Sequence, residues 1–166
     1  MRNENHVVYE SVVVIAVHMP GAEEMLFEDN HEQIMEQYRK FLNDCTKVMQ
    51  GNYCMDIVLY NNQIYGIYDG THNKTGWNLE TTGIRISRLV RKFNHDVKAY
   101  YAERLLCGIG IATGTATKIA VYNPFKQREL WLGHVFDKAY SMARMSVCDG
   151  RRRVFIDDSV ESHMYR

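Results

Sequence analysis

The amino-acid sequence predicts an α+β fold with a ferredoxin-like split βαβ core, in the order βαββαβ, followed by an extra strand and helix toward the C-terminus. Three observations support this prediction: a continuous run of β-branched residues, two β-rich runs joined by an Asn-Asn pair, and helical stripes of apolar residues. The 166 residues are 46% hydrophobic and 24% charged, a composition that can fill a core and excludes a disordered chain. We therefore expect a single domain over residues 1–166.

The first strand and the first helix have clear boundaries. Residues 11–17 form a run typical of a central strand covered on both faces, and Pro20-Gly21 ends it. A helix is predicted to follow Asn30, which has Gln33 at the spacing of an N-cap and its N3 partner. Gly51 closes this helix as a residue suited to positive φ. Its apolar stripe consists of Ile34, Tyr38, Phe41, Leu42, Cys45, Val48 and Met49.

A β-hairpin is predicted next, from residues 54–60 and 63–68. The intervening Asn61-Asn62 pair tolerates positive φ and suits a type I′ turn. The hairpin is rich in tyrosine, which fits either an interface or packing inside the domain. Residues 69–77 are polar and glycine-rich, and we expect them to form a loop.

The second half of the chain alternates helices and short strands. A second amphipathic helix is predicted around residues 86–97, with solvated arginines on its outer face. Two strands are predicted at residues 107–112 and 118–122, the first ending in Thr113-Gly114. Residues 135–146 form a third helix, and residues 154–156 a last strand.

Charge and cysteine content exclude several classes of function. Twenty basic residues balance twenty acidic ones, which argues against a nucleic-acid partner held through its phosphates. An RNA-binding module would have to use exposed aromatics and the Arg151-Arg152-Arg153 run, which we interpret as a solvated turn. The four cysteines are isolated, which favours a reduced, cytoplasmic protein. The longest apolar run, residues 12–17, is too short to cross a membrane, so no membrane partner is expected.

The element order, with these turns, resembles the catalytic domain of class III nucleotidyl cyclases, the adenylate and guanylate cyclases. The resemblance extends from about residue 12 to about residue 160. It rests on a strand end followed by a spaced glycine, a hairpin, a strand with Thr-Gly, a glycine before the last helix, and a closing strand with a serine-containing turn. The corresponding stretches are Ala16-Val17-His18-Met19-Pro20-Gly21, residues 56–68, residues 108–114, residues 132–139 and residues 154–159.

The resemblance implies a reaction and a metal site. Such enzymes cyclise a nucleoside triphosphate through attack of the ribose 3′-oxygen on the α-phosphorus, with two divalent ions held by two aspartates. The first aspartate position corresponds to His18, and the second to Asn62, or to Asn61 for a hairpin one residue shorter. Neither is a carboxylate, so the resemblance implies a degenerate site with no metal cofactor, and Mg²⁺ or Mn²⁺ only if the chain is active. The alternative interpretation of His18 is a strand-end histidine satisfied by backbone hydrogen bonds.

Other positions matched to the family also depart from its pattern. The base-recognition position corresponds to Val58, which cannot read a base edge by hydrogen bonding, and its polar partner to Glu129 or Leu130. The asparagine of the last helix corresponds to Asp137. The arginine one turn later corresponds to Ser141, while Lys138 and Arg144 are the cations of this helix that could reach a phosphate.

Two functions follow from the resemblance. The first is a cyclase-homology domain that has lost metal-dependent catalysis and acts as a nucleotide-binding, regulatory or dimerisation module. It would form a head-to-tail homodimer, or a heterodimer with an active cyclase, and could bind a nucleoside triphosphate. The second is an active divergent cyclase that converts a nucleoside triphosphate, such as a pyrimidine nucleotide in antiphage signalling, to a cyclic monophosphate and pyrophosphate.

Overall fold

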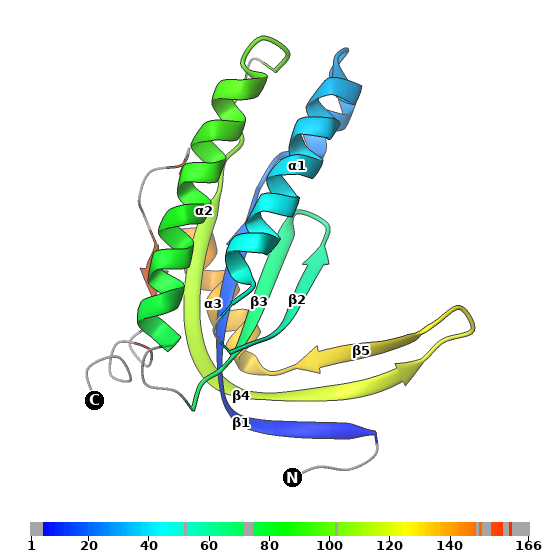
Figure 1. Ribbon diagram of the computed structural model, residues 1–166, viewed down its shortest axis with the longest axis vertical. Coiled ribbons are helices and arrows are strands. Elements are labelled where there is room, and N and C mark those ends of the chain that lie inside the picture. Colours follow the sequence, from blue (N-terminus) through cyan, green and yellow to red (C-terminus); the bar gives the residue numbers. More distant parts are fainter. Residues whose placement is uncertain are drawn as a thin grey trace.

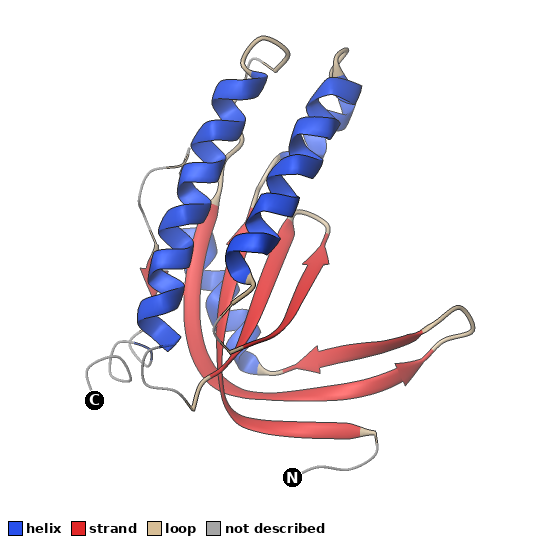
Figure 2. Ribbon diagram, viewed as in Figure 1, coloured by secondary structure: helices blue, strands red, loops and turns tan. Residues whose placement is uncertain are grey.

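A six-stranded sheet organises the chain, with two long helices on one face and a shorter helix on the other (Figures 1 and 2). The computed structural model describes residues 5–51, 53–71, 75–101, 103–148, 150, 154–157 and 160. Within these residues no helix is long and apolar enough to span a membrane. The elements in chain order are β1 (His6–His18), the 3₁₀ helix η1 (Ala22–Phe27), α1 (His31–Met49), β2 (Cys54–Tyr60), β3 (Gln63–Asp69), α2 (Thr75–Val97), β4 (Gly108–Tyr122), β5 (Gln127–Leu132), α3 (His134–Met145) and β6 (Phe155–Ile156).

The strand order confirms the predicted fold class. Neighbouring strands follow the order β2-β3-β1-β4-β5, each pair antiparallel, and β6 pairs with β4 in parallel. The first four strands in chain order therefore form the β2-β3-β1-β4 sheet of a split βαβ unit, with α1 and α2 as its two helices. The strand β5, the helix α3 and the strand β6 are the additions near the C-terminus.

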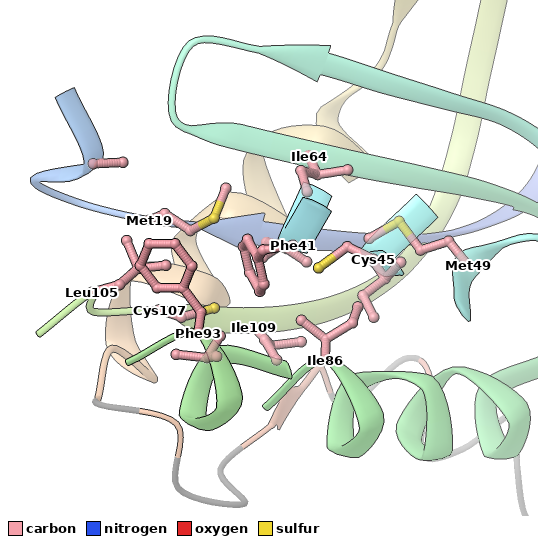
Figure 3. Close-up of a cluster of buried hydrophobic side chains, with 14 of the residues drawn as sticks. Met19, Phe41, Cys45, Met49, Ile64, Ile86, Phe93, Leu105, Cys107 and Ile109 are labelled. Carbon is pink, nitrogen blue, oxygen red and sulfur yellow. The ribbon is translucent and has the colours of Figure 1, made fainter. Parts of the chain in front are cut away.

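Strand β1 contributes to both hydrophobic clusters, as its unbroken β-branched sequence predicts. Val13, Ile15 and Val17 belong to the cluster under α1 and α2, because side chains two residues apart share one face of a strand. In that cluster Phe41 and Cys45 from α1 lie close to Ile86 and Phe93 from α2 (Figure 3). The alternate residues of β1 face α3, so this strand is buried on both sides. They are Val12, Val14 and Ala16.

The helix α3 lies very close to β4 because the facing residues are small. Gly108 and Gly110 of β4 lie against the α3 backbone, where a Cβ atom would overlap carbonyl oxygens of the helix. Ala139 and Ala143 are the helix residues buried at this contact. At the end of the helix, the Ser146 hydroxyl accepts a hydrogen bond from the Ile109 N–H at 2.6 Å, which ties α3 to the strand. The first residues of β4 thus require glycine on the α3 side.

A three-stranded arm extends from the sheet, formed by the first part of β1, the last part of β4 and β5 (Figure 1). The sequence predicted separate strands at residues 107–112 and 118–122, which is wrong: β4 is one strand of 15 residues. Gly114 pairs with Val12 where the register of β1 and β4 shifts, so the bend takes place within a continuous strand. For the same reason β1 begins at His6, before the predicted start.

Four local predictions have different outcomes. The hairpin is confirmed, but only Asn61 has positive φ, at 52°, so the turn is not type I′. Asn30 makes no side-chain capping bond, whereas Gly51 has the expected positive φ of 146°. The helix α2 begins at Thr75, inside the stretch expected to be a loop. The Arg151-Arg152-Arg153 run and the serine-containing turn at residues 158–159 lie outside the described residues.

Candidate functional site

His18 and Asn62, the two positions that the resemblance assigns to metal ligands, lie side by side. His18 is the last residue of β1 and pairs with Gln63 across the sheet. The Met19 N–H donates a hydrogen bond to the Asn62 carbonyl at 2.8 Å, which joins the strand end to the hairpin turn. Glu23 of η1 accepts a bond of 3.4 Å from the Asn62 side-chain amide. The site therefore contains one carboxylate, which the sequence analysis did not identify.

The cation next to His18 is Arg144 of α3. The Tyr140 ring of α3 lies edge-on to the imidazole, with 5.1 Å between ring centroids. The Arg144 guanidinium lies over the ring of Tyr140, 5.8 Å from its centroid. Burial, then the charge of Arg144, lower the pKa of His18, and Glu23 opposes them weakly. His18 is therefore neutral at pH 7, and the positive charge at this end of β1 is that of Arg144.

The ring of His18 is not satisfied in the way expected for a structural histidine. Its Nδ1 atom is buried and has no hydrogen-bond partner among the described residues. The interpretation of His18 as a histidine bonded to backbone is therefore wrong for this nitrogen. Tyr140 covers the ring by an aromatic contact instead, which leaves Nδ1 free to accept or donate a bond.

These residues do not fit two divalent ions. Among the described residues no three His, Cys, Asp or Glu side chains are grouped as a metal site requires. The donors present are a neutral imidazole, an amide and the exposed Glu23, and they bring one negative charge to a place already next to Arg144. Magnesium and manganese prefer several oxygen ligands with carboxylates among them. We therefore derive no catalytic step through a metal at this site.

The hairpin and α3 continue this face toward the arm. Tyr65 of β3 packs edge-on against Phe136, with centroids 5.9 Å apart, and its hydroxyl donates to the Gln63 side-chain oxygen at 2.8 Å. Burial, followed by the proximity of Tyr140 and Asp137, raises the pKa of Tyr65 to about 12. The Tyr65 hydroxyl consequently stays protonated and keeps its bond to Gln63.

At the position that the resemblance assigns to base recognition, the nonpolar Val58 has a polar neighbour. Val58 pairs with Tyr65 and packs in the cluster under α3, as a side chain of that face should. Asp56 lies on the same face of β2, and its carboxylate accepts a 2.9 Å hydrogen bond from the Trp131 indole N–H of β5. Trp131 packs between Tyr9 and Phe136, with Lys118 5.6 Å above its ring.

Glu129 and Leu130, the two candidates for the polar partner position, point to opposite faces of β5. Glu129 is two residues from Trp131 and therefore shares its face, whereas Leu130 points the opposite way. Glu129 forms an ion pair of 3.7 Å with Lys118. Together with Asp56, Lys126 and Arg128, Glu129 lines a concavity of about 540 Å³ between β2 and the arm.

The remaining candidates on α3 are solvent-exposed. Asp137 and Lys138 lie in its first half, and the Asp137 carboxylate is 3.8 Å from the His134 imidazole. The residue one turn after Asp137 is the exposed Ser141, which carries no charge. The structure therefore brings His18, Asn62 and Arg144 together and places Glu129 at the concavity. Val58 packs in the cluster under α3, and Asp137 and Lys138 are exposed on the helix surface.

Sequence reasoning missed Tyr140, Asp56 and Trp131. The period of two along β2 places Asp56 on the face of Val58, and that signal was available. The contact between Asp56 and Trp131 joins residues 75 positions apart and depends on the bend of the arm, so no local pattern indicates it.

Solved structures with this architecture are catalytic domains of nucleotidyl cyclases. The guanylyl cyclase Cya2 superposes with a TM-score of 0.79 at 13% identity, covering 96% of this chain and 80% of that one. The adenylyl cyclase CyaB from P. aeruginosa gives 0.77 at 14% identity, covering 96% and 82%. The chain has the class III cyclase catalytic fold. A dimeric guanylyl cyclase domain of the RhoGC fusion protein from the aquatic fungus Blastocladiella emersonii gives 0.71 at 14%, covering 96% and 85%.

The shared cyclase fold confirms the resemblance at the level of structure. No protein-family model and no curated protein sequence matches the chain. On this cyclase fold, the strand end and the hairpin turn meet as the resemblance implies, but they carry His18 and Asn62. The architecture is therefore shared with these domains, and the residues present at the junction of strand end and turn are an imidazole and an amide.

Proposed function

We propose that this chain is a cyclase-homology domain that has lost metal-dependent catalysis and binds a nucleoside triphosphate as a regulatory or dimerisation module. The observation that carries the proposal is the neutral pair His18 and Asn62, placed beside the cation Arg144 at the end of β1. A phosphate held there would be neutralised by the protein itself, because a guanidinium binds phosphate oxygens directly and is always charged.

Nucleotide binding without metal is the first expected result. We expect equilibrium dialysis to detect binding of at least one of the four ribonucleoside triphosphates in the presence of EDTA. Arg144→Gln should weaken this binding about tenfold or more, since a charge-assisted hydrogen bond is lost. Lys138→Gln removes the same charge from a position of α3 that does not influence His18, and it should change the affinity less than about twofold.

The same samples test for catalysis. Each triphosphate is incubated with manganese and the products are read by mass spectrometry, with an active cyclase as control. We expect no cyclic monophosphate. A cyclic product from any triphosphate would contradict the loss of catalysis and identify the chain as the alternative, an active divergent cyclase. Binding that disappears with EDTA would contradict the role given to Arg144.

Pairing of two copies is supported by exposed apolar side chains at two ends of the domain. On the arm, Tyr122 is 84% and Phe125 94% exposed, and near the hairpin Tyr60 is 73% exposed and Phe27 of η1 82%. Isolated exposed apolar residues are ordinary, but aromatics gathered at a projecting arm and at a hairpin turn fit protein interfaces. We propose a head-to-tail homodimer, or the corresponding heterodimer with an active cyclase.

Sedimentation velocity measures this assembly. We expect the natural chain to sediment with twice the mass of one chain, and Tyr122→Ser combined with Phe125→Ser to sediment as a monomer. Tyr100→Ser removes an exposed aromatic from the loop after α2 and should leave the dimer intact. A natural chain that remains monomeric at millimolar concentration, alone and mixed with an active cyclase, would contradict the proposal.

A further inference from the structure

Two cysteines, Cys107 and Cys148, lie opposite each other where the chain enters β4 and shortly after it leaves α3. They form an isolated antiparallel β-bridge outside the main strands. The Cys107 N–H donates a hydrogen bond to the Cys148 carbonyl at 2.8 Å, and the Cys148 N–H donates to the Cys107 carbonyl at 3.0 Å. Two residues that exchange both bonds in this way have their side chains on the same face of the paired segments.

The backbone geometry of this pair suits a disulfide. The Cα atoms of a hydrogen-bonded antiparallel pair are about 5.5 Å apart. Cα atoms joined by a disulfide are usually separated by about 4.4 to 6.8 Å, so the spacing of the bridge already falls within this range. Both cysteines carry free thiols in the structure. The reduced chain therefore holds two thiols at a separation from which they can be joined.

Contacts on either side of the bridge hold the two cysteines in place. The Ser146 hydroxyl accepts a hydrogen bond from the Ile109 N–H at 2.6 Å and donates one to the Ile109 carbonyl at 2.9 Å. Between these residues and the bridge, Gly108 packs so closely that a Cβ atom there would lie 2.9 Å from the Val147 side chain. The segment after α3 is therefore fixed on the start of β4 before any oxidant acts, which raises the effective concentration of one thiol next to the other.

The two thiols differ in exposure, and this difference sets the order in which they react. Cys148 is half-buried, whereas Cys107 is only 4% exposed. Burial, followed by the proximity of Cys148, raises the pKa of Cys107, so this thiol stays protonated at neutral pH. A thiolate reacts only with a reagent that can reach it. Cys148 is therefore the thiol that meets a reagent from solvent, and Cys107 is the one that reacts with Cys148 afterwards.

The other two cysteines of the chain are less suited to this chemistry. Cys45 belongs to the same hydrophobic cluster as Cys107 (Figure 3), but it is completely buried. Burial also raises the pKa of Cys45 well above its usual value. Cys54 is half-buried and pairs with Tyr68 across the hairpin. The pair of Cys107 and Cys148 combines an accessible thiol with a second cysteine directly opposite.

We propose that Cys107 and Cys148 form a reversible disulfide, with a small-molecule disulfide as the oxidant. The Cys148 thiolate attacks one sulfur of the small disulfide and displaces a thiolate, which leaves a mixed disulfide on Cys148. Cys107 then loses its proton to solvent and attacks the Sγ atom of Cys148, displacing the second thiolate. In sum, the two protein thiols lose two electrons and two protons, and the small disulfide becomes two thiols. Excess small thiol reverses both steps.

The bond would fix the end of α3 on the start of β4. It would close a loop of about 40 residues, and a closed loop restricts the unfolded chain more than the folded one. The loop contains β4, β5 and α3, and with them Arg144. Oxidation would therefore restrict the helix that carries the cation of the candidate site. Formation of the bond does not depend on nucleotide binding at that site.

The test uses the full chain in native buffer, incubated with oxidised glutathione. The remaining thiols are then blocked, and the chain is digested without reductant for mass spectrometry. We expect a pair of peptides linking Cys107 to Cys148, which dithiothreitol separates. The Tm of the oxidised chain should exceed that of the reduced chain by about 5 °C or more. Cys54→Ser is the matched control, because it removes a half-buried thiol and should leave both the linkage and the Tm shift unchanged.

Variants of the two bridge residues complete the test. Cys148→Ser should abolish both the linkage and the Tm shift. Cys107→Ala should leave only a glutathione mixed disulfide on Cys148, and it serves as the second variant if Cys148→Ser does not fold. A natural chain that stops at this mixed disulfide, links Cys107 to Cys45, or forms the bond only in urea would overturn the proposal. A bond between Cys107 and Cys148 with an unchanged Tm would overturn its role in fixing α3.

Discussion

Gly110→Ala is expected to destabilise the domain by about 3 kcal/mol or more, because the contact between β4 and α3 has no room for a side chain. A Cβ atom at Gly110 would overlap the carbonyl oxygen of Ala139 and lie 2.6 Å from the Cβ of Met142. Neither atom is the flexible end of a side chain, so the helix itself must move away from the sheet. Urea unfolding followed by circular dichroism gives the change in the free energy of unfolding.

Substitutions at two further glycines of β4 serve as comparisons. Gly108→Ala meets the backbone carbonyl of Ala143 and should cost at least as much as Gly110→Ala. Gly114→Ala, on the same strand, has its nearest neighbour 3.2 Å away at the Cβ of Val135 and should cost less than about 1.5 kcal/mol. If all three variants were equally stable, the close approach of α3 to β4 would be refuted.

Installing two carboxylates at the strand end is expected to create a metal site. His18→Asp with Asn62→Asp should raise the affinity for Mn²⁺ at least about a hundredfold over the natural chain. Even in water a pair of unit charges 4 Å apart contributes about 1 kcal/mol, and each carboxylate here would face a divalent ion. Glu23 would supply a third carboxylate, because it already contacts Asn62. Electron paramagnetic resonance of free Mn²⁺ measures the binding.

The controls for this prediction keep the site neutral. His18→Asn with Asn62→Ser changes the same positions without adding charge and should leave Mn²⁺ binding as weak as in the natural chain. If the natural chain bound Mn²⁺ as tightly as the variant with both aspartates, the proposal that its metal ligands are lost would be contradicted. A double aspartate that folds but binds no Mn²⁺ would contradict the adjacency of the strand end and the hairpin turn.

The periodicity of apolar residues was sufficient to predict the core but not the arm. The β-branched run of β1 and the stripes of α1 and α2 predict burial correctly because alternation and helical spacing are local properties. The bend that unites residues 108–122 into β4 is not local: it depends on pairing with β1 on one side and with β5 on the other. Two short apolar runs around Thr113-Gly114 therefore suggested two strands.

The residues of the candidate site were likewise predicted only in part. The resemblance identified His18 and Asn62 as neighbours, and the helical spacing of α3 identified Arg144. Tyr140, which lies between His18 and Arg144, was missed because nothing in the sequence indicates that the last turns of α3 lie under the end of β1. Val58 puts a nonpolar side chain at the position that the resemblance assigns to base recognition, whereas Asp56 on the same face is polar and accepts a hydrogen bond from Trp131.

The continuity of β1 and β4 through the bend has a mechanical consequence. The arm is built from the same two strands that form the centre of the sheet, so no loop separates the arm from the sheet in these strands. The register shift between Tyr9 and Val12 is the one irregularity in their pairing, and beyond it β1 runs straight to His18. A change in the position of the arm on binding a partner would therefore act directly on β1, the strand that ends at the candidate site.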